Sequence, residues 1–144
     1  MSNNINIGWG RRSINPGDKA IAIPGQFHMR VSLGELNPVT VNALAIENGE
    51  DSVIFVTADI VSIRYSILDT VIEKLKTIDP TVPGEKIIFS STHTHAGPNA
   101  AEKTYPCEVE WMAKDEALDF LSDRIAEAIA EAWKNRAPGQ IAYG

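Results

Sequence analysis

The feature that most constrains the fold is a pair of β-branched segments on either side of an Asn-Gly turn. Residues 39–46 and 53–57 carry the β-branched side chains, and Asn48-Gly49 lies between them. Such residues favour extended backbone, and Asn-Gly is a strong local signal for a tight turn between antiparallel strands. The sequence therefore predicts a β-hairpin at this place.

Segments on both sides of this hairpin predict a larger sheet with helices. Further strands are expected at residues 5–9, 86–91 and 140–143, and apolar side chains at helical spacing predict a helix over residues 63–76. A second helix, stopped by Pro-Gly at residues 138–139, has an apolar stripe made of Leu118, Leu121, Ile125, Ile129 and Trp133. The expected fold class is α/β, a mixed sheet with flanking α-helices.

Three stretches carry turn residues and little periodicity. Residues 11–24 are expected to be irregular, residues 26–37 to be a loop with some extended structure, and residues 93–114 to be a long loop. Long loops in compact domains tend to be functional. Ligands of α/β sheets gather beyond the carboxyl ends of strands, which is where the last of these loops begins.

Composition bounds the class of protein. The 144 residues, 44% hydrophobic and 22% charged, suit one globular domain, and we expect residues 1–144 to form it. The net charge of −6 argues against nucleic acid or an anionic membrane as a partner. One cysteine excludes a multi-cysteine metal cage, and no run approaches the roughly 20 apolar residues of a membrane span.

The two ends of the sequence lead to further expectations. The N-terminus lacks the basic start and apolar run of a signal peptide, which predicts a cytoplasmic protein, or a secreted or periplasmic one if a leader was removed. The sequence ends as the strand at residues 140–143 begins, which predicts an incomplete, N-terminal part of a larger domain. An open sheet edge there would invite pairing, so we expect a homo-oligomer or a complementing chain.

Two of the three histidines stand one residue apart, just after the strand predicted at residues 86–91. His93 and His95 belong to the string Thr-His-Thr-His-Ala-Gly-Pro at residues 92–98. In extended backbone, side chains two positions apart point to the same side, about 7 Å apart along the strand. Either both imidazoles bind one metal ion, or one binds it while the other handles protons or binds substrate.

Nearby residues are candidates for supporting roles. Asp59 follows the second hairpin strand and either accepts a hydrogen bond from a metal-ligating imidazole or caps a turn. Gly97 allows close approach of the backbone to a substrate, and Asn99 could donate a hydrogen bond to it. His28 faces either the same cleft or solvent, and Arg30 either binds a polar group of the substrate or is solvated.

The string at residues 92–98 resembles the Thr-His-Thr-His-Ser-Gly-Pro signature of the neutral, non-lysosomal ceramidases. The likeness extends over residues 5–98, because a short strand, a hairpin ending in Asp59-Ile60-Val61, a helix and the His-x-His strand follow in the family's order. The resemblance implies zinc-dependent hydrolysis of N-acyl sphingosine-like lipid amides.

Position by position, the resemblance implies that His93 is a ligand of Zn²⁺ and that His95 is a catalytic residue beside the scissile amide. Ala96 stands where the family has serine, which removes one hydroxyl. Family members take a second zinc histidine, a glutamate and a tyrosine from later in a far longer chain, so we expect this chain to carry only part of the site. A non-catalytic metal-binding or assembly fragment that needs a second chain, and an amidase or esterase of other specificity, stay open as alternatives.

Overall fold

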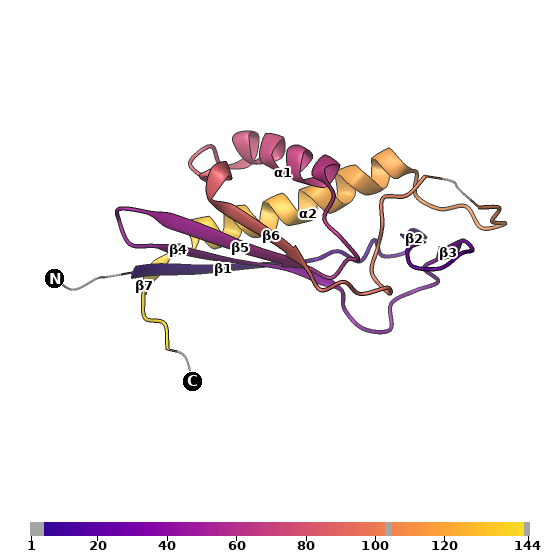
Figure 1. Cartoon of the computed structure of the whole chain (residues 1–144), viewed down its shortest axis with the longest axis horizontal. Helices are drawn as coiled ribbons and strands as arrows, with labels where there is room; N and C mark the ends of the chain where they lie inside the picture. Colours follow the sequence, from indigo (N-terminus) through magenta and orange to yellow (C-terminus); the bar gives the residue numbers. More distant parts are fainter. Residues whose placement is uncertain (1–4, 103–104, 143–144) are drawn as a thin grey trace.

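The computed structural model describes residues 5–102 and 105–142, and its centre is a five-stranded sheet (Figure 1). The spatial order of the strands is β6-β5-β4-β1-β7, and all neighbours are antiparallel except β5 and β6, which are parallel. Their bounds are β1 Ile5–Ser13, β4 Thr40–Glu47, β5 Ser52–Ala58, β6 Ile87–Ser91 and β7 Ala137–Gly139. A small second sheet pairs β2 (Ala22–Ile23) with β3 (Arg30–Val31) beyond one end of the main sheet.

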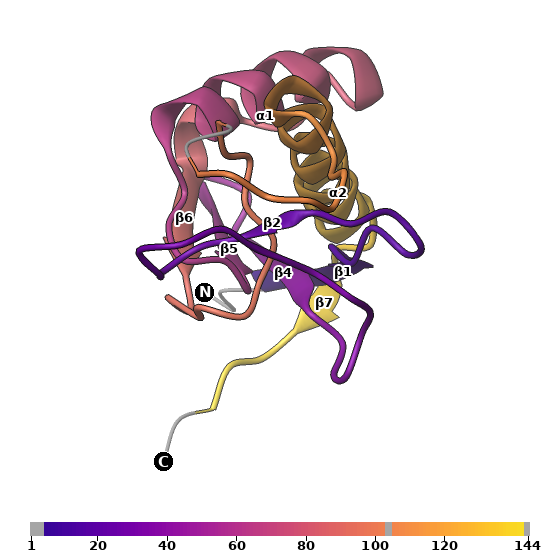
Figure 2. The same cartoon turned by 90° about the vertical axis from the view of Figure 1, so that its right-hand side faces the viewer.

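Two helices lie on the same face of the main sheet (Figure 2). Helix α1 (Tyr65–Ile78) connects the parallel strands β5 and β6, with a short 3₁₀ turn (Gly84–Lys86) before β6, and α2 (Lys114–Lys134) runs along the sheet. The expected mixed α/β sheet with flanking helices is confirmed. Helix α1 begins two residues later than predicted, because apolar spacing indicates a face of a helix and marks its ends poorly.

The predicted hairpin is the β4–β5 pair. The Asn48 side-chain Oδ1 accepts hydrogen bonds from the backbone N–H groups of Glu50 (2.9 Å) and Asp51 (2.7 Å), which stabilises the turn. Alternate residues of both strands are buried against the helices, and they are Val41, Ala43, Ala45, Ile54, Val56 and Ala58. The other face of the same strands has no helix over it in the part of the chain that the structure describes.

Helix α2 lies so close to β1 that there is no room for a side chain at two positions of the strand. A Cβ added at Gly8 would lie 2.0 Å from the Ala132 carbonyl oxygen, and one added at Gly10 would lie 1.9 Å from that of Ala128. The buried face of α2 is therefore broader and richer in alanine than the predicted stripe, and it includes Ala117, Leu121, Ser122, Ile125, Ala126, Ala128, Ile129 and Ala132. Leu118 and Trp133 are only partly buried.

The last two strands of the sheet order, β1 and the edge strand β7, differ from the prediction. Strand β1 continues to Ser13 because it pairs with β4 as far as Ser13 opposite Thr40. The last strand is β7 at Ala137–Gly139, not residues 140–143, because its pairing with β1 begins at once after α2. Its Pro138 is tolerated because β7 lies at the sheet edge; Tyr143 lies outside the described residues.

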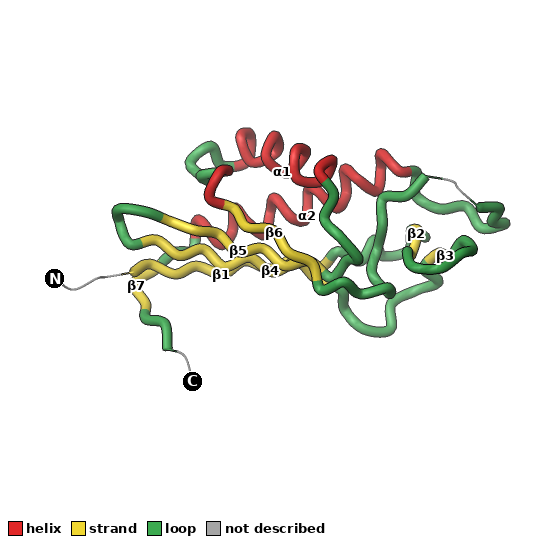
Figure 3. The backbone as a smooth tube through the Cα atoms, viewed as in Figure 1, coloured by secondary structure: helices red, strands yellow, loops and turns green. Residues whose placement is uncertain are grey.

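The predicted loops gather at one end of the molecule, where β5 and β6 both end (Figure 3). Residues 92–113 form the long connection into α2, with residues 103–104 outside the description. Among the described residues, no helix is both long and apolar enough to cross a membrane.

Candidate functional site

The site begins where the chain leaves β6. The Thr92 N–H donates to the Ala58 carbonyl (3.0 Å), which extends the pairing with β5 by one hydrogen bond. The next residue, His93, has φ of 61°, and it is the one non-glycine residue with positive φ among those the structure describes. A left-handed backbone costs energy in any residue with a Cβ atom, and such strain is concentrated at functional sites.

The His93 side chain is held by a backbone carbonyl. Its Nδ1 lies 2.7 Å from the carbonyl oxygen of Val61, in the segment between β5 and α1. A carbonyl can only accept, so the proton sits on Nδ1 and the neutral ring presents the lone pair of Nε2. This is the tautomer and the kind of support that metal-ligating histidines have in proteins.

The second histidine lies beside the first. The ring centroids of His93 and His95 are 5.2 Å apart with planes inclined by 70°, and both residues are exposed. Their proximity comes from the left-handed turn at His93 and not from strand alternation, because β6 ends at Ser91. Two imidazoles thus reach one small volume by a route that differs from the one expected.

The connection between β2 and β3 supports His95. A Cβ added at Gly25, whose φ is 97°, would lie 1.9 Å from His95 Nδ1, so glycine alone leaves room for this ring. The Arg30 guanidinium donates to the backbone carbonyls of His95 and of Pro24. Sequence reasoning missed both supports: a Pro-Gly turn signal is visible at residues 24–25, but nothing local shows which loop the turn meets.

Asp59 supports a different part of the site from the one expected. Its Oδ2 accepts hydrogen bonds from the Thr40 backbone N–H (2.9 Å) and hydroxyl (3.2 Å), so the carboxylate joins the ends of β5 and β4. The hydrogen-bond partner of His93 Nδ1 is the Val61 carbonyl and not Asp59. The Asp59 carbonyl also packs on Gly97, where an added Cβ would lie 2.0 Å away.

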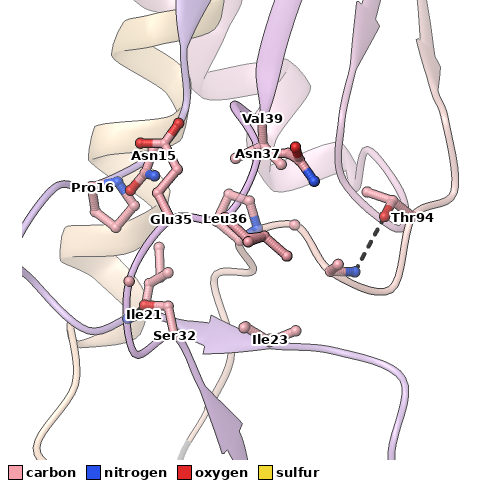
Figure 4. Close-up of a pocket in the computed structure, with 14 residues that line it drawn as sticks. Asn15, Pro16, Ile21, Ile23, Ser32, Glu35, Leu36, Asn37, Val39 and Thr94 are labelled. Atoms are coloured by element: carbon pink, nitrogen blue, oxygen red, sulfur yellow. Dashed lines mark hydrogen bonds between the residues drawn. The ribbon is translucent and has the colours of Figure 1, made fainter.

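A cavity of about 370 Å³ lies next to the histidine turn (Figure 4). Its wall is largely apolar and includes Ile21, Ile23, Leu36, Val39, Thr94 and Gly97. Of the two predicted substrate residues, Gly97 lines this cavity, while the Asn99 backbone N–H donates to Ala22 (2.9 Å) and ties the loop to β2. The third histidine, His28, is exposed in the β2–β3 connection.

The donor set suits zinc but does not complete a zinc site. Neutral imidazoles are common zinc ligands, and structural or catalytic sites use three or four protein ligands. Among the described residues, no group of three or more His, Cys, Asp or Glu side chains is placed to hold a metal ion. His93 and His95 can therefore supply at most two donors.

Comparison with known protein families identifies the family. The sequence profile of the neutral/alkaline non-lysosomal ceramidases, N-terminal region, matches residues 37–144. The match begins later than the likeness read from the sequence and continues past Pro98 through α2. No curated protein matches the chain.

Two solved structures share the fold. A crystal structure of neutral ceramidase from Pseudomonas aeruginosa is 21% identical with a TM-score of 0.78, covering 96% of this chain and 23% of that chain. A ceramidase complexed with C2 is also 21% identical, with a TM-score of 0.75, covering 96% of this chain and 22% of that one. The present chain thus spans under a quarter of the length of these structures. Because the family match covers more than half of its residues, this chain belongs to the neutral/alkaline non-lysosomal ceramidase family, of which it carries the N-terminal region.

Proposed function

We propose that this chain supplies His93, His95 and part of the substrate cavity to an enzyme that hydrolyses the amide bond of ceramide-like lipids. The observation that carries the proposal is the pair of exposed imidazoles, 5.2 Å apart, on a strained turn at the carboxyl end of β6. Membership of the ceramidase family supports the reaction class.

His93 would hold a zinc ion through Nε2, because its Nδ1–H is committed to the Val61 carbonyl. When bound, zinc supplies a Lewis acid that polarises the amide carbonyl and makes water more acidic. His95, whose ring lies beside that of His93, accepts a proton from the attacking water and returns one to the departing amine nitrogen. Gly25 and Arg30 keep its ring in position for both transfers.

The cavity beside the turn suits the hydrocarbon part of such a substrate. Its wall is more apolar than polar, although Asn15, Ser32, Glu35 and Asn37 also line it, and alkyl groups gain free energy by leaving water for apolar surface. Thr94 and Gly97 line the side of the cavity nearest the histidines, so a chain lying there would bring its polar head to the imidazoles.

A second function is favoured by the small number of donors. Because the described residues supply fewer than three grouped ligands, the 144-residue chain alone would bind zinc weakly and depend on ligands from another polypeptide. In that case it acts as a metal-binding or assembly fragment, and turnover appears only with the complementing chain.

The test is zinc titration of the isolated chain followed by NMR of the histidine Hε1 signals, with hydrolysis of a fluorescent N-acyl amide measured in parallel. We expect zinc to move the His93 signal, and His93→Ala to remove zinc-dependent changes at His95. His28→Ala is the matched control, because it removes an exposed imidazole that is not one of the pair. Equal zinc binding by the wild type and His93→Ala would refute the proposed metal role, whereas zinc binding without hydrolysis favours the fragment.

A further inference from the structure

Residues 59–61, which follow β5 directly, contact the turn that carries the histidine pair at two points, and we call them the support segment. The carbonyl oxygen of Val61 lies 2.7 Å from His93 Nδ1. A Cβ added at Gly97 would lie 2.0 Å from the Asp59 carbonyl oxygen, and Gly97 is buried, so the backbones pack directly on each other there. The position of the support segment therefore determines where both ends of the histidine turn lie.

The support segment is itself held by one carboxylate, one backbone hydrogen bond and one buried side chain. The Asp59 Oδ2 accepts hydrogen bonds from the backbone N–H (2.9 Å) and the hydroxyl (3.2 Å) of Thr40. The Asp59 N–H donates to the Thr40 carbonyl (2.9 Å), and the Ile60 side chain, 2% exposed, belongs to the main core. A substitution at Asp59 removes the carboxylate contacts and leaves the backbone bond and the apolar anchor possible, so the carboxylate can be tested alone.

Thr40 is a firm attachment point for this carboxylate. It is the first residue of β4, lies opposite Ser13 of β1 and is 7% exposed. Its hydroxyl accepts a hydrogen bond from the Asn42 side-chain amide (3.1 Å) and gives its own proton to Asp59. Loss of the carboxylate would leave two donors of Thr40 without an acceptor in a largely buried place, which is costly unless the support segment moves or water enters.

From these contacts we propose that Asp59 is a positioning residue, which acts on His93 through the backbone of the support segment. By attaching this segment to β4, the carboxylate keeps the Val61 carbonyl within hydrogen-bond distance of His93 Nδ1. The neutral ring then carries its proton on Nδ1 and presents the lone pair of Nε2, whereas a ring without this acceptor can place its proton on either nitrogen. The inference rests on the proposed function where Nε2 is taken as a metal donor, and the tautomer can be measured without metal.

Nitrogen-15 NMR of the metal-free 144-residue chain tests the proposal, because protonated and unprotonated imidazole nitrogens give well-separated signals. Spectra are recorded near pH 8.5, about two units above the ordinary imidazole pKa of about 6.5. We expect wild-type His93 to show a protonated Nδ1 and an unprotonated Nε2. In Asp59→Ala the two signals should move toward each other as the ring exchanges between tautomers. Asp59→Asn, whose side-chain oxygen still accepts from Thr40, should keep the wild-type signals.

Asp79→Ala is the matched control, because the Asp79 carboxylate also accepts from the backbone N–H (3.0 Å) and hydroxyl (2.6 Å) of a threonine, Thr81. This pair lies in the loop that precedes β6, whereas the histidine turn follows β6, so the His93 signals should stay unchanged. Thr40→Val removes the hydroxyl donor and keeps the β-branched shape, so it should move the signals part of the way. Circular dichroism checks folding, and Thr40→Val decides the test if Asp59→Ala does not fold.

Zinc titration of the same variants separates this inference from the proposed function. We expect Asp59→Ala to bind zinc about 10-fold more weakly than the wild type, as is typical when the support of a metal ligand is removed. His93 signals that keep their wild-type positions in every folded variant at Asp59 and Thr40, or that move equally in Asp79→Ala, would overturn the inference. A tautomer that depends on Asp59 in a chain that binds no zinc would support the positioning role and contradict the proposed metal role.

Discussion

Two glycines show how differently the two ends of the molecule are built. A Cβ at Gly10 would lie 1.9 Å from the Ala128 carbonyl oxygen of α2, and a Cβ at Gly25 would lie 1.9 Å from His95 Nδ1. The first contact joins backbone to backbone inside the main core, and the second joins a loop to an exposed imidazole. Two equally close contacts thus have different consequences: the one at Gly10 contributes to the stability of the core, and the one at Gly25 fixes the position of the His95 ring.

The two regions also differ in how they tolerate strain. Around Gly10 the residues have regular helix and strand conformations, and many of them are buried. Because this packing is close, α2 and β1 cannot shift locally to make room for an added atom. Around His93 a left-handed residue is held by one hydrogen bond to Val61 and by neighbouring loops. Loops with few buried contacts can open locally without unfolding the domain. Changes at the histidine end should thus alter the site more than the stability.

Gly10→Ala should have the largest effect on stability, because the new methyl group meets helix backbone that can move only if α2 shifts as a whole. We expect a loss of about 3 kcal/mol or more in the free energy of unfolding, measured by urea denaturation. Gly84→Ala is the control, since its Cβ would meet only the end of the Ile72 side chain at 3.2 Å. Equal losses in the two variants would contradict the proposed rigidity of the β1–α2 contact.

Substitutions at His93 measure the strain in the turn. His93→Gly and His93→Ala both remove the hydrogen bond to Val61, but only alanine must keep a Cβ in the left-handed conformation. We expect the glycine variant to be more stable than the alanine variant by about 1–2 kcal/mol in thermal or urea unfolding. If the two variants are equally stable, the turn either carries no strain or rearranges when the ring is lost.

Gly25→Ala should sharpen the contrast with Gly10→Ala. The methyl group displaces the His95 ring or detaches the β2–β3 connection, so the global loss should be about 1 kcal/mol or less. The Hε1 signals of His93 and His95 should nevertheless shift, because the edge-to-face contact between the rings is lost. Unchanged histidine signals would show that Gly25 does not position His95.

Glu131→Gln, in helix α2, should have the smallest effect on the free energy of unfolding. The Arg11 backbone N–H and the Arg12 guanidinium both donate to Glu131 and hold the pKa of its carboxyl below the ordinary value. A depressed pKa in the folded state stabilises the protein above the ordinary carboxyl range, and this contribution is lost as pH falls through the folded pKa. Because Glu131 is partly exposed, Glu131→Gln should cost under about 1 kcal/mol near neutral pH.

The pH dependence separates this ion pair from general packing. The stability difference between the wild type and Glu131→Gln should shrink toward zero in strong acid, in urea unfolding curves recorded across the acid range. A difference that persists in acid would mean that the glutamate acts by packing or hydrogen-bond geometry and not by its charge.

Much of the fold could be predicted because its signals are local. The β4–β5 hairpin, both helices and β6 each have their own periodicity or turn residues, and all were placed within a few residues. The length of β1 and the position of β7 were not, because the first depends on pairing with β4 and the second on pairing with β1, which is more than 100 residues away in the sequence. Periodicity within one segment carries no information on how far a distant partner extends.

The candidate site divides in the same way. The histidine pair was visible as a motif, and its place after β6 followed from the strand prediction. The Val61 carbonyl, the Gly25 contact and the Arg30 hydrogen bonds were not visible, because two of them use backbone atoms that every residue has. Asp59 drew attention through its side chain, yet its hydrogen bonds join β5 to β4 at Thr40.

By itself the sequence determined most of the segments that form strands and helices, singled out His93 and His95 as candidate site residues, and indicated the family to which the chain belongs. Only the tertiary structure decided that His93 adopts a left-handed conformation, which loop supports His95, and that one face of the sheet has no cover within the described chain. The physical reason is the separation along the sequence over which each kind of information acts. Side-chain type and periodicity act over a few residues, whereas these features arise from contacts between backbone segments that meet only in the folded molecule.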